Sequence, residues 1–176
     1  MAEQRSVDIP GIDNEDILYH YRLGVFHAMW GSIDLVTDMA IGRFLGLGHD
    51  DTHAVTWGMM FGAKAKLLAN LIRRSEHPSK ATLLTSLNAL RGDAKRDILA
   101  HGYQVEGHGH VGFLERPRGG SDKAFKGTLH LFTYETFRLH VNKLIGDGIA
   151  FMDILDYDQD DINAFAEAAR SKTISA

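Results

Sequence analysis

The spacing of apolar residues in the N-terminal part of the chain is the feature that most constrains the fold. From Leu18 to Phe44 an apolar residue recurs every three or four positions. This spacing places the apolar side chains on one face of an α-helix. Asp13 or Asn14 can accept a hydrogen bond from the first turn, so we expect a helix that begins there and ends near Phe44. Residues 1–12 are expected to form a flexible arm.

Two further helices are predicted by the same spacing. The segment GLGHDD interrupts the first pattern, and Asp51 or Thr52 can cap a second helix that runs to about Arg74. The segment SEHPS is the next interruption. A third helix is expected from about Ser79 to Gly102, because glycine is a common residue at the end of a helix.

The pattern changes after Gly102. VGFLERP and FKGTLHLF are short and strand-like, and RGGSDK between them is typical of a turn, so we expect a β-hairpin at about residues 110–132. Thr133 can cap a fourth long helix, and Asp160 or Asp161 can cap a short last helix. The sequence therefore predicts a mainly α protein, an up-down helical bundle with one inserted hairpin, in a single domain at 13–172.

Composition excludes several kinds of chemistry. The 176 residues include no cysteine, which excludes disulfides, thiolate metal sites and thiol catalysis. The N-terminal residues lack the pattern of a signal peptide, and no apolar run approaches the roughly 20 residues of a membrane helix. We therefore expect a cytoplasmic protein that does not enter a membrane.

Charge is distributed unevenly along the chain. The net charge is -4, yet the segment from Lys64 to Lys126 contains 12 Lys and Arg residues against 6 Asp and Glu residues. Such a basic middle between acidic ends can present a positive face to a phosphate backbone. The alternative is that these charges are scattered over a solvated surface.

The segment KRDILAHGYQ, residues 95–104, combines groups suited to phosphate chemistry. Arg96 can hold a phosphate through two hydrogen bonds, and the imidazole of His101 can move a proton near neutral pH. Asp97, four positions before His101, can orient the imidazole ring. These groups are the tools for attack of an RNA 2′-hydroxyl on the adjacent phosphate, with Arg96 stabilising the developing charge.

The octapeptide RDILAHGY, Arg96 to Tyr103, resembles the signature of the HEPN superfamily. In this signature four residues separate an Arg from a His, and one residue of any type separates the His from a Tyr. The resemblance implies a small helical bundle with the signature near the end of a long helix. It also implies a metal-independent ribonuclease that acts as a homodimer, with Arg96 and His101 catalytic and Asp97 in support. Some members are toxins paired with a nucleotidyltransferase antitoxin that modifies the tyrosine, here Tyr103.

Other interpretations of the same region stay open. The protein can be a non-catalytic module that binds a nucleotide, RNA or a protein through the signature residues. It can also be a structural dimer in which these residues are the ordinary polar end of a helix. Basic residues nearby are possible contacts to an RNA backbone. These residues are Arg91, Lys95, Arg116 and Arg118.

Two patterns resemble metal sites without matching a known motif. The segment HGYQVEGHGH places His101, His108 and His110 close to Glu106, but the spacing fits no zinc motif. The segment DYDQDDINAFAE has the acids of a calcium loop, but Asp161 occupies the position that requires glycine. We therefore predict no metal and no cofactor.

Overall fold

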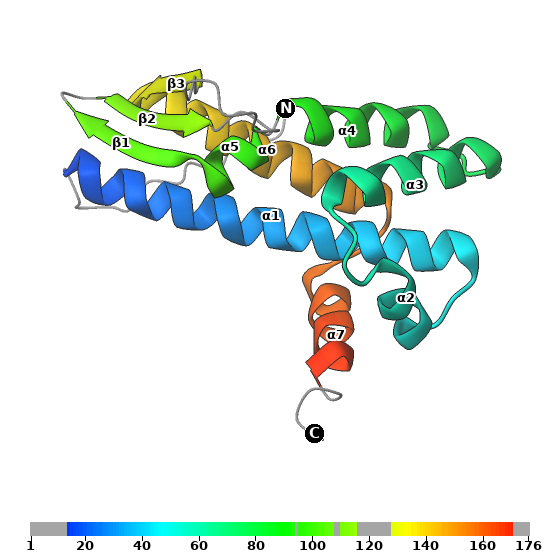
Figure 1. Ribbon diagram of the computed structural model, residues 1–176. Helices are drawn as coiled ribbons and strands as arrows, with labels where there is room; N and C mark the ends of the chain where they lie inside the picture. The colour runs from blue at the N-terminus through cyan, green and yellow to red at the C-terminus, as the bar shows by residue number, and fades with distance from the viewer. Residues whose placement is uncertain (1–13, 94, 108–109, 116–127, 171–176) are drawn as a thin grey trace, which may run out of the picture. The chain divides into compact units, whose positions relative to one another are not determined.

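The computed structural model describes residues 14–93, 95–107, 110–115 and 128–170. Within these residues the protein is mainly helical with one small antiparallel sheet, which confirms the predicted mainly α class (Figure 1). The helices are α1 (Glu15–Leu45), α2 (His49–Thr56), α3 (Phe61–Arg74), α4 (Lys80–Asp93), α5 (Arg96–His101), α6 (Tyr134–Ile154) and α7 (Gln159–Arg170). The strands are β1 (Tyr103–Gly107), β2 (His110–Glu115) and β3 (Thr128–Thr133). No helix in these ranges is both long and apolar enough to cross a membrane.

The chain divides into two compact units. We call residues 1–27 and 94–145 the sheet unit, and residues 28–93 and 146–176 the helical unit. Helices α1 and α6 contribute one part to each unit. The predicted arm and the predicted hairpin turn RGGSDK lie outside the described residues, and the single domain stays a prediction.

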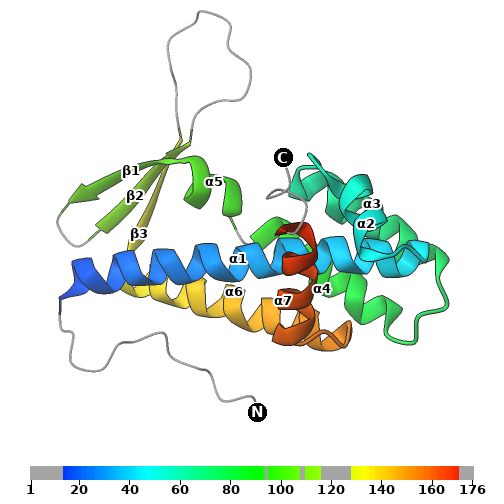
Figure 2. The same cartoon turned by 90° about the horizontal axis from the view of Figure 1, so that it is seen from below.

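The core of the sheet unit is aromatic. Its strands lie in the order β1-β2-β3, each antiparallel to the next (Figure 2). Phe113 of β2 and Phe132 of β3 are buried on one face of the sheet, where their rings meet that of Phe137 from α6. Tyr19 of α1 also contacts the Phe137 ring, with a centroid distance of 5.0 Å. Val111 and Phe113 are two residues apart in β2, so the period of two in a strand places them on the same face as Phe132, the register partner of Val111.

The opposite face of the sheet is apolar and exposed. Val105, Gly112 and Leu131 are register partners across the three strands, and Leu129 lies on the same face. Val105, Leu129 and Leu131 are all exposed. A Cβ atom on Gly112 would lie 3.1 Å from side-chain atoms of both leucines. The two leucines therefore cover Gly112 and form a continuous apolar surface.

The helical unit is built from pairs of packed helices. Helices α3 and α4 lie side by side, and α2 contacts α7 (Figure 1). The ring of His53 in α2 stacks on Phe165 of α7 at a centroid distance of 4.0 Å, and its Nε2 atom lies 3.2 Å from the Phe165 carbonyl oxygen. A Cβ atom on Gly42 would lie 2.0 Å from Thr52 Oγ1, so a glycine at this position allows α1 to approach α2.

Two predicted helices are interrupted, and both predictions were wrong in this respect. The expected second helix is divided into α2 and α3 at Gly58, whose φ of 73° a glycine adopts without steric cost. The expected third helix is divided into α4 and α5 at Lys95, which has a left-handed φ of 47°. The strand β1 was also missed, since only two strands were expected between Gly102 and Thr133.

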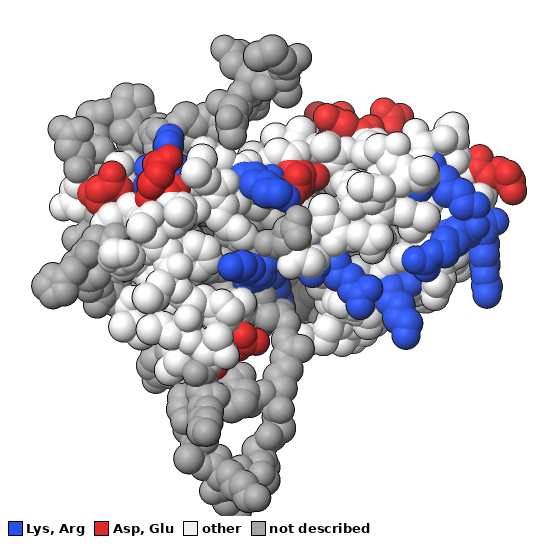
Figure 3. All heavy atoms as spheres, turned by 90° about the horizontal axis from the view of Figure 1, so that it is seen from above, with Lys and Arg blue, Asp and Glu red and all other residues white. Residues whose placement is uncertain are grey.

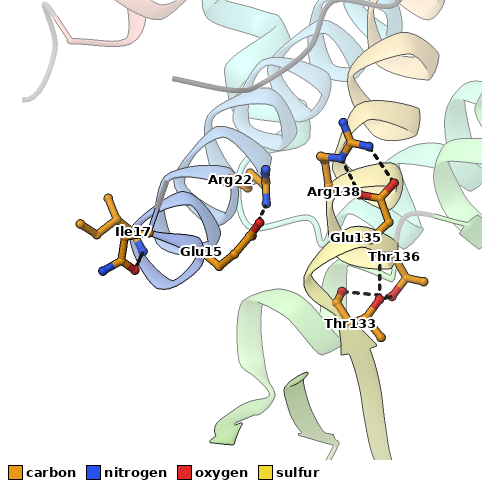
Figure 4. Close-up of polar contacts among 8 residues, drawn as sticks. Glu15, Ile17, Arg22, Thr133, Glu135, Thr136 and Arg138 are labelled. Carbon is orange, nitrogen blue, oxygen red and sulfur yellow. Dashed lines mark hydrogen bonds and ion pairs between the residues drawn. The ribbon is translucent and has the colours of Figure 1, made fainter. Parts of the chain in front are cut away.

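The helix caps were predicted with partial success. Asn14 Oδ1 accepts from the Ile17 backbone N–H, and Thr133 Oγ1 accepts from that of Thr136 (Figure 4). Both agree with the prediction. The last helix is capped differently, because Asp158 Oδ1 accepts from the N–H groups of Asp160 and Asp161 at 2.9 Å each. The predicted caps, Asp160 and Asp161, instead lie in the first turn of α7, where their backbone N–H groups donate to the Asp158 side chain.

Candidate functional site

The signature residues lie in the short helix α5 and at the start of β1, near the beginning of the second segment of the sheet unit. Arg96 is the first residue of α5, Asp97 the second and His101 the last, and Tyr103 is the first residue of β1. The resemblance implied a position near the end of a long helix. The break at Lys95 separates α5 from α4, so the signature forms a six-residue helix of its own.

The residues that flank α5 are both sterically constrained. Lys95, directly before Arg96, adopts a left-handed conformation that costs a non-glycine residue roughly 1 kcal/mol or more. At the other end, the Gly102 N–H donates to the Ile98 carbonyl at 2.7 Å. A Cβ atom on Gly102 would lie 2.3 Å from that same carbonyl oxygen. Glycine is therefore required by packing at this position of the signature, whatever the function.

The structure describes the predicted catalytic residues unequally. Arg96 is partly exposed, and its Nε atom is buried. The side chains of Asp97, His101 and Tyr103 lie outside what the structure describes. The backbone of α5 places Arg96 and His101 five residues apart, which corresponds to about 7.5 Å along the axis and roughly 140° around it. The two residues therefore lie on different faces of one helix.

The structure describes two of the four predicted RNA backbone contacts, one in each unit. Lys95 is exposed in the sheet unit, where its Nζ atom lies 5.2 Å from the centroid of the Phe132 ring. Arg91 is exposed on α4, in the helical unit. Arg116 and Arg118 lie outside the described residues.

A second polar cluster, which the sequence analysis missed, lies in the helical unit. The Nζ atom of Lys64 on α3 donates to Asp34 Oδ2 at 3.0 Å and to Asp38 Oδ2 at 2.8 Å, both on α1. Lys64 and Asp38 are each only 6% exposed. The other oxygen of each carboxylate is buried without a hydrogen-bond partner among the described residues. One ammonium group is thus shared by two carboxylates in a protected environment.

The pKa values in this cluster reflect the excess of carboxylates. Burial, together with the negative charge of Asp34, raises the pKa of Asp38 even though Lys64 opposes this. Burial lowers the pKa of Lys64, but its hydrogen bonds to Asp38 and Asp34 outweigh burial and raise it. Both directions are consistent, because the lysine is near two negative charges while Asp38 is near one charge of each sign.

The sequence contained a signal for this cluster. Asp34 and Asp38 are four residues apart, so they lie on one helix face, and they occur within the most apolar helical segment of the chain. Two acids in such a segment need a buried cation. The sequence does not show which cation this is, because the partner is brought in by tertiary packing.

Several basic residues of the sheet unit form ion pairs with glutamates. Arg138 donates to both oxygens of Glu135 at 2.9 and 2.7 Å, and Arg22 Nη1 lies 3.5 Å from Glu15 Oε2 (Figure 4). His130 Nε2 lies 3.0 Å from Glu115 Oε2. Arg22 is buried, whereas Arg138 and His130 are partly exposed, and partly exposed pairs contribute little stability. In each pair a glutamate already contacts the basic group that a ligand would need.

Metal ligands do not gather among the described residues. Within these ranges no group of three or more histidine, aspartate or glutamate side chains could hold a metal ion. His108, of the possible zinc pattern, lies outside them. In the calcium-like segment Asp158 serves as the cap of α7.

Comparison with known proteins gives no independent assignment: no protein-family model, no curated protein and no solved structure matches this chain.

Proposed function

We propose that the protein is a metal-independent endoribonuclease of the HEPN type, which acts as a homodimer. The observation that carries the proposal is the signature RDILAHGY, whose Arg96 and His101 begin and end one short helix. A strained residue directly before that helix supports the proposal, because unfavourable backbone conformations cluster at functional sites.

The proposed reaction needs one acid–base group and one cation. His101 removes the proton of a 2′-hydroxyl, and the resulting oxygen attacks the adjacent phosphorus. The bond from phosphorus to the 5′-oxygen breaks, and that oxygen receives a proton from the protonated imidazole of a second His101. Arg96 stabilises the extra negative charge on phosphorus. The products carry a 2′,3′-cyclic phosphate and a 5′-hydroxyl.

The orientation of α5 favours a dimer for this chemistry. Arg96 and His101 diverge by roughly 140° on a straight helix, so a single copy presents them on different sides. A symmetric pair brings two copies of each residue to one interface. Cytoplasmic location, RNA as substrate and a nucleotidyltransferase antitoxin acting on Tyr103 belong to the same proposal.

The alternative is a non-catalytic module that binds a nucleotide, RNA or a protein through the same surface. The observation that favours it is the partial burial of Arg96, whose Nε atom is shielded from solvent. A catalytic arginine needs its guanidinium group in contact with the substrate. A structural arginine needs only its partners within the chain.

Cleavage separates the two functions. The full-length protein is incubated with a mixture of structured and unstructured RNAs in the presence of a chelator, and the fragment ends are analysed. We expect 2′,3′-cyclic phosphate ends, and His101→Ala should lower the cleavage rate by about 10²- to 10⁴-fold. The matched control is His110→Ala, an exposed histidine of β2, which should cleave normally. Intact RNA with the wild-type protein, or equal cleavage by the two variants, contradicts the ribonuclease proposal.

A further inference from the structure

One face of α3 carries basic and polar residues and no acid. The sequence of α3, FGAKAKLLANLIRR, contains no Asp or Glu. Lys66, Asn70 and Arg73 are separated by four and then three positions, so they lie on one face of the helix, with Arg74 beside them. All four residues are exposed. We call these four residues the α3 basic face.

The cations of the α3 basic face are available to a ligand. Lys66, Arg73 and Arg74 form no ion pair with any residue that the structure describes. Arg73 donates to Asn70 Oδ1 at 3.1 Å, which positions its guanidinium group without neutralising it. Residues 61–92 contain 6 Lys and Arg residues and one acid, Glu76. Figure 3 shows basic side chains gathered over the part of the surface that α3 and α4 form.

The spacing of the cations fits a polymer better than a single phosphate group. Lys66 and Arg73 are seven residues apart, which is about 10.5 Å along the helix axis. Two cations at that separation contact different phosphates of one strand. A chain of phosphates therefore uses the whole face, whereas a mononucleotide would use one end of it.

An exposed aromatic residue lies just before α3 in the sequence. Trp57 is 87% exposed, and the turn at Gly58 follows it. The start of α3 is held by Trp30 of α1, which is 7% exposed and contacts the Phe61 ring at a centroid distance of 4.7 Å. Exposed aromatic rings near cations are typical of single-stranded nucleic-acid sites, because unpaired bases stack on them.

The same face is unsuited to a bilayer. A helix that lies on a membrane needs large apolar residues beside its basic residues so that it can insert. No large apolar residue of α3 is exposed.

We infer that the α3 basic face binds the backbone of single-stranded RNA, with a base stacked on Trp57. The inference rests on the proposed function for its choice of RNA, and it adds a binding surface in the helical unit to the signature in the sheet unit. Lys66, Arg73 and Arg74 contact phosphates, and Asn70 holds Arg73 in place.

The test measures binding separately from cleavage. Full-length His101→Ala protein is titrated with a labelled unstructured RNA at several salt concentrations. A plot of log affinity against log salt concentration has a negative slope. For a single strand, each lost phosphate contact makes this slope shallower by about 0.7. Lys66→Ala with Arg73→Ala should therefore reduce the slope by about 1.4 and weaken binding roughly tenfold or more. Trp57→Ala should weaken binding by about 5- to 100-fold, and Trp57 fluorescence should be quenched on binding.

The matched control removes the same charge from the sheet unit. Arg138→Ala with Lys143→Ala changes the net charge equally and should alter affinity by less than about threefold, because these α6 residues lie outside the α3 basic face. Equal weakening by the two double variants would mean that only net charge matters, and it would overturn the inference. Equal affinity for poly-glutamate, or binding to phosphatidylserine vesicles but not to RNA, would overturn it too.

The two proposals can fail independently. Normal cleavage with unchanged RNA affinity in the α3 variants removes the binding surface and leaves the ribonuclease intact. Salt-dependent RNA binding that the α3 variants weaken, in a protein that never cleaves, removes the ribonuclease and leaves an RNA-binding protein.

Discussion

The two units differ in how their cations are paired. In the sheet unit Arg22, which is buried, and Arg138, which is partly exposed, each form an ion pair with a nearby glutamate. In the helical unit Lys64 is buried between two aspartates, while Lys66, two residues later, has no carboxylate partner among the described residues. A count of basic residues therefore says little about ligand binding. Only a cation without a carboxylate partner can bind an anionic ligand without first breaking an existing ion pair.

The largest expected effect is on the buried cluster. Lys64→Met leaves the buried carboxylate of Asp38 and the half-buried carboxylate of Asp34 without a cation, and should lower the free energy of unfolding by about 3–5 kcal/mol. Lys66→Met, on the exposed face of the same helix, should change it by less than about 0.5 kcal/mol. Chemical denaturation measures both. Similar values for the two variants would show that the contrast between the faces of α3 is wrong.

The next effect lies in the sheet unit. Gly102→Ala places a Cβ atom against the Ile98 carbonyl and should destabilise the protein by about 2 kcal/mol, as overpacking typically does. The control is Gly24→Ala in α1, where no atom would lie within 4 Å of the new Cβ. There alanine should stabilise the helix by about 0.5–1 kcal/mol. Thermal unfolding that ranks the two variants the other way would contradict the close packing at the end of α5.

Among the described residues each unit contains one non-glycine residue with a positive φ, and these two should respond differently to glycine. Lys95→Gly should raise the free energy of unfolding by about 0.5–1 kcal/mol, because glycine adopts a φ of 47° freely. Asp156→Gly should raise it less, since aspartate tolerates a φ of 56° better than lysine. Lys95→Ala removes the side chain without relieving the strain, so it must be no more stable than the wild type for this explanation to hold.

The smallest effect is a pH dependence that belongs to the helical unit. Because the pKa of Asp38 is raised above its ordinary value of 3.8, the folded state holds this proton more tightly than the unfolded state. Its contribution to the free energy of unfolding therefore falls as pH rises from about 4 through the folded pKa. Asp38→Asn removes the titrating group, so wild-type stability should decline relative to the variant across this window. Parallel stability curves would argue against a raised pKa.

The fold could be predicted where local signals agreed. For α1 the apolar period and the cap at Asn14 pointed to the same limits. The breaks at Gly58 and Lys95 were missed because apolar spacing continues through both, and a left-handed lysine has no signature in the sequence. The catalytic pair stays a prediction that rests on its signature, whereas the Lys64 cluster depends on contacts between residues about thirty positions apart. Such contacts are formed by tertiary packing, which a local pattern does not reveal.

The double hydrogen bond of Lys64 has a consequence for how α3 and α1 align. Asp34 and Asp38 are one turn apart, and the Lys64 nitrogen reaches both. Sliding α3 along α1 by one turn, about 5.4 Å, would take that nitrogen out of reach of at least one carboxylate. Apolar side chains tolerate neighbouring alignments at similar energy, but a shared ammonium does not. The cluster therefore selects one register for this helix pair and excludes its near alternatives.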